Sequence, residues 1–258
     1  MLKGNASVAQ TPAPYQVPGK YRFDYSVEQV LTSKRHEADT SVMHFFYTKS
    51  GDYAAARVSG RANRKGNLLM VLTRDGMGII FDEHDKSITI ISLRKLASDL
   101  TGLTKWIRMD SLMAHMRKQG DENRFQSVKT GNTRPIGNYT AEEYTVTGKG
   151  EHKGSVWVTP VDFNTMGDYM LDAVGAGWLK MMMMNQQTTH PLFQAMIQPK
   201  TLVTAVDLKD STGEKVMEMH TVGIDPLTTT VSTSGYTIND YSNMTLPEIF
   251  QAEMKKRN

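Results

Sequence analysis

The sequence contains no cysteine among its 258 residues. That absence excludes disulfide bonds, thiolate nucleophiles and cysteine-based zinc sites. Long apolar runs are missing too, because no stretch approaches the roughly 18–20 residues that span a bilayer. The first residues lack the apolar segment of a signal peptide. Residues 1–19 instead have the Pro/Ala/Gln composition of a flexible tether, and we expect one folded domain over residues 20–258.

Catalytic and nucleotide-binding motifs are equally scarce. The sequence has no G-x-S-x-G, H-E-x-x-H, P-loop or G-x-G-x-x-G pattern, so we expect no catalytic residues, no cofactor and no enzymatic activity. Met217, Met219 and His220 are the residue types that bind Cu(I). In a strand, however, the two methionines share a face and His220 points away, so we expect no metal site. The net charge is only +3, and its interleaved signs predict no nucleic-acid partner.

Alternating apolar residues predict a protein made mainly of strands. Tyr21, Phe23, Tyr25 and Val27 share one face of a long first strand. Further short strands, separated by turn residues, follow along the first 93 residues, and we expect them to form an antiparallel meander in which each strand lies beside its predecessor. The whole chain gives about twelve strands, which include a hairpin over residues 201–222 and a last strand or two over residues 228–240.

Three segments have a helical pattern instead. Apolar residues from Leu93 to about Gly120 recur every three to four positions, which predicts a broken or paired amphipathic helix. A second helical segment covers residues 164–199 and ends near Pro191. Thr245 and Glu248 form a capping-box pattern that opens a short C-terminal helix, whose apolar side carries Ile249, Phe250 and Met254.

The stretch from Thr130 to Phe163 predicts a β-hairpin around which the other strands are arranged. If Val146 opposes Val156, Tyr144 opposes Val158 and one face becomes an apolar patch. Pro160 ends the second arm, since it has no N–H to donate. The adjacent residues Glu142 and Glu143 point to opposite faces of their strand, so they cannot act together on one substrate atom. We therefore interpret this hairpin as scaffold.

The same hairpin resembles a bacterial envelope family defined only as a domain of unknown function. The family carries G-x-Y-x-C-E-E-Y-x-V followed by V-W-V-T. The matching residues here are Gly137, Tyr139, Glu142, Glu143, Tyr144, Val146 and Val156 to Thr159. Ala141 stands where many members have cysteine. The resemblance extends over roughly Lys20 to Phe163, and it includes the segment GIIFDEHDKSITIIS as a second hairpin.

Proteins of this family are similar in fold to the LolA and LolB lipoprotein carriers. The resemblance implies a mainly β (α+β) fold, in which a strongly curved antiparallel sheet or half-barrel carries helices on its concave side. In the carriers, that apolar concave face holds acyl chains. It also implies a periplasmic or outer-membrane-associated location and a lipid or lipoprotein acyl chain as partner. The resemblance implies no catalytic residue.

Methionine is abundant, with 18 residues in the chain, and it suits irregular cores or adaptable binding surfaces. Four consecutive methionines cannot all face one core, so the helical segments either pack on the sheet or form a mobile apolar lid over a cavity. The predicted ligand-binding residues are Trp178, Leu179, Met181, Met182, Met183 and Met184, with Trp106, Ile107 and Met109 in second rank. The predicted function is non-enzymatic binding of a hydrophobic or amphipathic ligand. The alternative is a protein-interaction module of an envelope assembly that binds an envelope protein and no small ligand.

Overall fold

A computed structural model describes residues 14–33, 39–60, 68–106, 125–148, 153–172 and 198–257. Within these ranges, twelve strands form one continuous sheet in the order β12-β6-β5-β4-β3-β2-β1-β11-β10-β9-β8-β7. The strands are β1 (Lys20–Ser33), β2 (Asp39–Tyr47), β3 (Tyr53–Gly60), β4 (Leu68–Thr73), β5 (Met77–Asp82), β6 (Ser87–Ser92), β7 (Phe125–Ile136), β8 (Tyr139–Gly148), β9 (Lys153–Pro160), β10 (Thr201–Lys209), β11 (Lys215–Ser232) and β12 (Thr237–Asp240).

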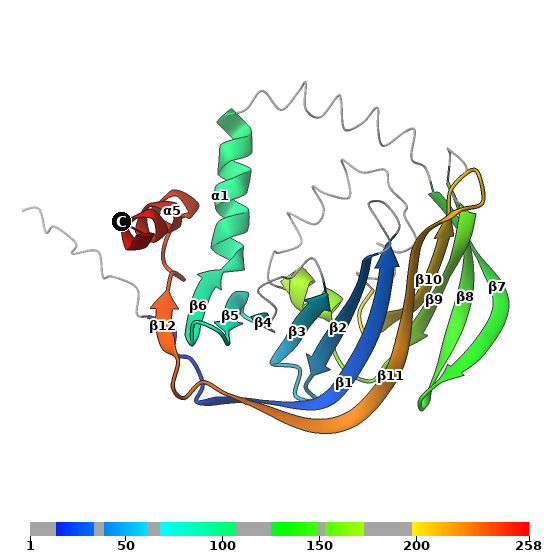
Figure 1. Ribbon diagram of the computed structural model, residues 1–258, viewed down its shortest axis with the longest axis horizontal. Coiled ribbons are helices and arrows are strands. Elements are labelled where there is room, and N and C mark those ends of the chain that lie inside the picture. Colours follow the sequence, from blue (N-terminus) through cyan, green and yellow to red (C-terminus); the bar gives the residue numbers. More distant parts are fainter. Residues whose placement is uncertain are drawn as a thin grey trace, which may run out of the picture.

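The sheet is open and strongly curved (Figure 1). Its edges are β7 and β12, and strands β1 to β6 form the predicted meander, each paired with its predecessor. All neighbouring strands are antiparallel except β12, which pairs in parallel with β6. The predicted fold class, a mainly β protein with a curved antiparallel sheet, is therefore confirmed.

The curvature comes from β1 and β11, the two longest strands. Their pairing carries register shifts between Phe23 and Tyr25 and between Glu28 and Gln29. Such bulges bend a strand and increase its twist. The ends of β1 and β11 near Lys20 and Ser232 consequently pass beneath β3 to β6, while their other ends rise along β10 (Figure 1).

This bending gives the sheet apolar clusters on both faces. Adjacent residues of β3, Ala54 and Ala55, belong to different clusters, as do Val71 and Leu72 of β4. An outer core fills the space between the ends of β1 and β11 and the lower face of β3 to β6; its buried members are Tyr21, Phe23, Ala55, Leu69, Val71, Ile79, Phe81, Ile88 and Ile90. A concave core lies on the inner face and consists of Tyr25, Val27, Tyr47, Ala54, Leu72, Val161, Phe163, Tyr169, Leu202 and Ile224.

Three helical stretches are described. Helix α1 (Leu93–Trp106) follows β6 directly, and the remainder of its predicted extent lies outside the described residues. A short helix at residues 166–172 packs Tyr169 into the concave core. Helix α5 (Leu246–Arg257) has the predicted capping box, because Glu248 Oε2 accepts hydrogen bonds from Thr245 N and Oγ1, both at 2.7 Å. Within the described part of the chain, no helix is both long and apolar enough to cross a membrane.

Two expectations about strands were wrong. Val146 opposes Gly154 and Tyr144 opposes Val156, a register two residues away from the predicted pairing. Glycines that were predicted to lie in the loop belong to the strands, because β8 ends at Gly148 and β9 includes Gly154. A Cβ atom at Gly154 would lie only 1.8 Å from Asp207 O. Because the shift is even, each side chain keeps its face.

The second error concerns β11. It is one continuous strand of 18 residues, whereas the sequence predicted an end at Val222 and a separate strand from Thr228. Pro226 lies at a position where the pairing with β1 is already irregular, so its missing N–H interrupts no regular ladder.

Candidate functional site: an apolar cavity on the concave face

A cavity of about 250 Å³ opens on the concave face of the sheet. Its described lining residues are Gln29, Leu31, Met43, Phe45, Tyr47, Thr165, Met166, Gly167, Thr201, Leu202, Val203, Met217 and Met219. Strands β1, β2, β10 and β11 form its wall, and the start of the helix at residues 166–172 borders it. None of these described residues is charged.

Strand alternation explains why these side chains meet. Met43, Phe45 and Tyr47 follow one another at every second position of β2, and Met217 and Met219 do the same on β11. Gln29 opposes Met43 in the β1–β2 ladder, and Leu31 opposes Met219 in the β1–β11 ladder. The cavity wall is therefore one side of four neighbouring strands.

Methionine contributes four of these side chains, which are Met43, Met166, Met217 and Met219. A thioether is flexible and polarisable, so such a wall can adapt to the shape of an apolar guest. Met217 and Met219 share a face as predicted, and His220, the next residue, is exposed on the other face. The arrangement separates the imidazole from the thioethers and does not bring together the residues of a Cu(I) site.

One polar side chain lies deep in this wall. Gln29 is only 6% exposed, and its Nε2 donates to Val203 O at 2.8 Å and to Thr221 Oγ1 at 3.1 Å. The two threonines of the lining direct their hydroxyl protons away from the cavity. Thr165 Oγ1 donates to Asp168 Oδ2 at 3.0 Å, and Thr201 Oγ1 donates to Pro199 O at 3.0 Å.

An aromatic cluster packs against the lining residue Tyr47. Phe163 stacks on Tyr47, a lining residue, with ring centroids 5.0 Å apart, and on Tyr25 at 4.5 Å. Burial raises the pKa of the Tyr47 phenol well above its ordinary value, so this hydroxyl is neutral. The end of the Thr130–Phe163 stretch thus supports the site, in keeping with its interpretation as scaffold.

Beside this cluster, Asp162 accepts hydrogen bonds from two phenols. Tyr139 Oη donates to Asp162 Oδ1 at 2.6 Å, and Tyr25 Oη donates to Asp162 Oδ2 at 3.4 Å. The bond from Tyr139 holds the pKa of the Asp162 carboxyl below its usual value. In turn, burial and the nearby carboxylate raise the pKa of the Tyr139 phenol. These bonds fix the two tyrosines around Phe163.

Other clusters of polar residues have structural explanations. Asp82, His84 and Asp85 place potential metal ligands close together in the β5–β6 turn. However, Asp82 Oδ1 already accepts the backbone N–H groups of His84 and Asp85, which is what stabilises such a turn. This turn is exposed to solvent and offers no enclosed site.

The two glutamates of the hairpin are separated as predicted. Glu142 forms an ion pair with Lys129 at 2.8 Å, whereas Glu143 Oε2 accepts a hydrogen bond from Asn132 Nδ2 at 2.7 Å.

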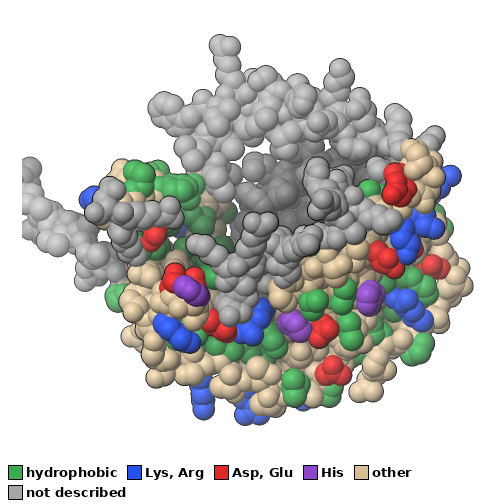
Figure 2. Space-filling model, viewed as in Figure 1, with side chains coloured by type: hydrophobic (Ala, Val, Ile, Leu, Met, Phe, Trp, Pro, Cys, Tyr) green, Lys and Arg blue, Asp and Glu red, His purple; other side chains and the backbone are tan. Residues whose placement is uncertain are grey.

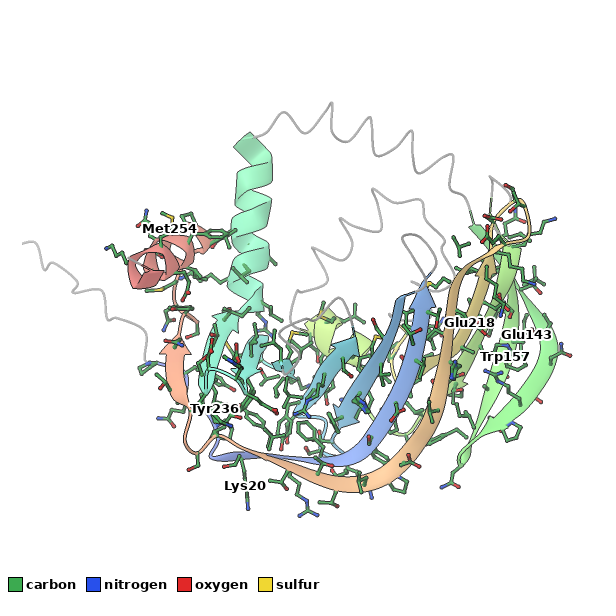
Figure 3. All side chains as sticks on the ribbon, in the orientation of Figure 1. Lys20, Glu143, Trp157, Glu218, Tyr236 and Met254 are labelled. Carbon is green, nitrogen blue, oxygen red and sulfur yellow. The ribbon has the colours of Figure 1, made fainter. Side chains whose placement is uncertain are left out.

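Glu143 and Trp157 lie on the arm of the sheet formed by β7 to β9, and Met254 lies on α5 at the opposite arm (Figure 3). On the molecular face shown in Figure 2, acidic and basic side chains are interspersed with hydrophobic ones.

The described lining includes none of the residues predicted to bind a ligand, and most of those residues lie outside the part of the chain that the structure describes. Trp178, Leu179, Met181 to Met184, Ile107 and Met109 lie outside the described residues. Trp106 is the last residue of α1. The cavity residues on β1, β2 and β11 did carry a signal, namely an alternation of large apolar side chains. That alternation is common to every half-buried strand, so it could not mark these strands as a binding site.

No protein-family model matches the chain, and no curated protein matches it. The family suggested by the hairpin motif is therefore not confirmed. Among solved structures, the chain is similar to an uncharacterised conserved protein from Thermus thermophilus, with 5% identity, a TM-score of 0.34, and coverage of 79% of this chain and 80% of that chain.

It is also similar to MucB in complex with MucA(peri), with 11% identity, a TM-score of 0.33, and coverage of 80% of this chain and 50% of that chain. A LolA-superfamily protein from Nitrosomonas europaea matches with 10% identity, a TM-score of 0.27, and coverage of 80% of this chain and 86% of that chain. TM-scores this low do not establish a common function.

Proposed function

We propose that this protein binds the apolar chain of a hydrophobic or amphipathic ligand, such as a lipid or the acyl chain of a lipidated peptide, in the concave cavity. The observation that carries the proposal is an apolar cavity whose described lining has no charged side chain. Apolar side chains that remain accessible in a cavity of about 250 Å³ gain free energy when an apolar guest covers them.

The energetics favour an apolar guest. Burying one methylene group is worth about 0.8 kcal/mol, so a chain of eight methylenes gains roughly 6 kcal/mol before the cost of association is subtracted. Water gains little in the same space, because it needs two to four polar partners and the described wall is mostly methionine, aliphatic and aromatic.

The binding would be non-enzymatic, and we place the protein in the periplasm or at the outer membrane. Both statements are part of the proposal and follow the resemblance of the Thr130–Phe163 hairpin to an envelope family. A lipid that co-purifies with the protein would support the binding of an apolar ligand. If the chain is instead a protein-interaction module, the cavity would hold no apolar ligand.

The test measures binding of the neutral fluorescent probe N-phenyl-1-naphthylamine and, separately, examines a solvent extract of the native protein by mass spectrometry. We expect saturable probe binding and a co-purified lipid. Met43→Trp fills the cavity and should weaken probe binding at least tenfold. The matched control His44→Trp adds a ring at the next position of β2, on the opposite face, and should bind as the unaltered protein does. Absence of saturable binding by the unaltered protein, or equal loss in both variants, would refute the proposal.

A further inference from the structure

The side-chain polar groups in the cavity wall differ in what they can still offer a ligand. Both N–H bonds of the Gln29 amide are directed at protein acceptors, Val203 O and Thr221 Oγ1. The hydroxyl protons of Thr165 and Thr201 are also donated to protein oxygens. The carbonyl oxygen of the Gln29 side chain, in contrast, accepts no hydrogen bond from any described residue and is not fully buried.

A ligand that fills the cavity would cover this oxygen, and polar groups that are covered in this way are nearly always hydrogen-bonded. Covering such an acceptor without supplying a donor costs free energy. A ligand that brings an O–H or N–H group to this oxygen removes that cost. A ligand without such a donor leaves the cost in place.

The absence of charged side chains from the described lining also favours an uncharged ligand. No described lining residue carries a positive charge, so an ionised carboxylate or phosphate would lose its hydration without gaining a cationic partner. We therefore expect the cavity to favour an uncharged ligand over an ionised one.

We infer that the ligand of this cavity ends in an uncharged hydrogen-bond donor, such as the hydroxyl group of a fatty alcohol or a monoacylglycerol or the N–H of a fatty amide, which is held by Gln29 Oε1. This inference rests on the proposed binding of an apolar chain and names the chemistry of its polar end. Ionised fatty acids and phosphate-headed lipids are the classes that it excludes from the buried position.

The experiment displaces N-phenyl-1-naphthylamine from the full chain at pH 8 with three ten-carbon compounds. They are 1-decanol, which has a neutral donor, decyl methyl ether, which has no donor, and decanoate, which is ionised at this pH. We expect 1-decanol to displace the probe at concentrations at least fivefold lower than the ether and at least tenfold lower than decanoate. Equal potency of 1-decanol and the ether, or stronger displacement by decanoate, would overturn the inference.

Two variants assign the effect to one oxygen. Gln29→Met keeps the length of the side chain but removes the acceptor, so 1-decanol should lose its advantage over the ether. Thr221→Val removes only one acceptor of the Gln29 amide N–H bonds and leaves Gln29 Oε1 in place, so that advantage should persist. If Gln29→Met does not fold, the comparison of the three compounds on the unaltered protein still tests whether the cavity prefers an uncharged hydrogen-bond donor.

The two proposals fail in different ways. If the unaltered protein does not bind N-phenyl-1-naphthylamine, both the cavity function and this inference are wrong. If it binds the probe but does not distinguish 1-decanol from the ether, only the role of Gln29 is wrong and the cavity remains a binding site for apolar chains.

Discussion

The side-chain amide of Gln29 on β1 donates a hydrogen bond of 2.8 Å to the backbone oxygen of Val203 on β10, although β11 lies between these two strands. Both residues lie at register shifts, one between Glu28 and Gln29 and the other between Val203 and Ala205. A bulge leaves a backbone group unpaired. The Gln29 amide satisfies one such carbonyl and ties three strands together at the cavity wall.

Replacing this amide should destabilise the fold. Gln29→Met leaves the buried Val203 carbonyl without a donor, and we expect the free energy of unfolding to decrease by about 1–3 kcal/mol. Thr221→Val removes only the second, longer bond of Gln29 and should cost less. Urea titration followed by circular dichroism measures both. An equal loss of unfolding free energy in the two variants would show that the bond to Val203 O adds no stability beyond that of the bond to Thr221 Oγ1.

Phe163 should be one of the residues on which stability depends most. Its ring contacts Tyr25, Tyr47 and Tyr139, with centroids 4.5, 5.0 and 6.3 Å away, and its side chain is buried. Phe163→Ala should lower the free energy of unfolding by about 3–5 kcal/mol. Met254→Ala is the control, because this side chain is 64% exposed and its loss should change stability by no more than about 0.5 kcal/mol. If urea unfolding shows only a small effect of Phe163→Ala, the prediction is contradicted, and the neighbouring rings must move to fill the space that the phenyl ring leaves.

Gly154 should not tolerate a side chain. A Cβ atom there would lie 1.8 Å from Asp207 O and 3.0 Å from Leu208 Cα, both on β10. Because these are backbone atoms, β9 and β10 must separate to admit a methyl group. We expect Gly154→Ala to reduce the melting temperature by several degrees, as a loss of about 1 kcal/mol or more does. Gly19→Ala, where no atom lies within 4 Å, should leave it unchanged.

The bond between Tyr139 and Asp162 should appear in the pH dependence of stability. The pKa of Asp162 is lower in the folded protein than its usual value, which is near 3.9 in unfolded chains. The carboxylate therefore stabilises the fold above the unfolded pKa, and this contribution is lost as the pH falls through the folded pKa. Tyr139→Phe removes the main cause of the shift, so its deficit in unfolding free energy should be largest at neutral pH and shrink below pH 4.

The matched control for that measurement is Tyr144→Phe, which removes a phenol from the same strand without removing a bond to Asp162. Urea unfolding at a series of pH values should show no comparable pH-dependent difference for this variant. A deficit of Tyr139→Phe that stays constant down to acidic pH would contradict the assignment of the Asp162 shift to the Tyr139 hydroxyl.

Much of the fold could be predicted from local patterns. The alternation of Tyr21, Phe23, Tyr25 and Val27 gives β1, and the turn residues between short apolar runs give the meander of β2 to β6. Thr245 and Glu248 gave the start of α5, because a capping box is made by residues three positions apart. The β8–β9 register and the continuity of β11 were not predictable in this way, since both depend on how closely a third strand approaches.

By itself, the sequence determined where most strands lie, which side of each is apolar, and that no cysteine, catalytic motif or long apolar span is present. These properties are local, because they follow from side-chain alternation and residue type. Only the tertiary structure decided where the site lies. It brought Gln29 and Leu31 of β1 beside Met43 of β2, Val203 of β10 and Met217 of β11, and left the side-chain oxygen of Gln29 without a described hydrogen-bond donor. That outcome depends on strand order and bulges, which arise when segments far apart in the chain pack together.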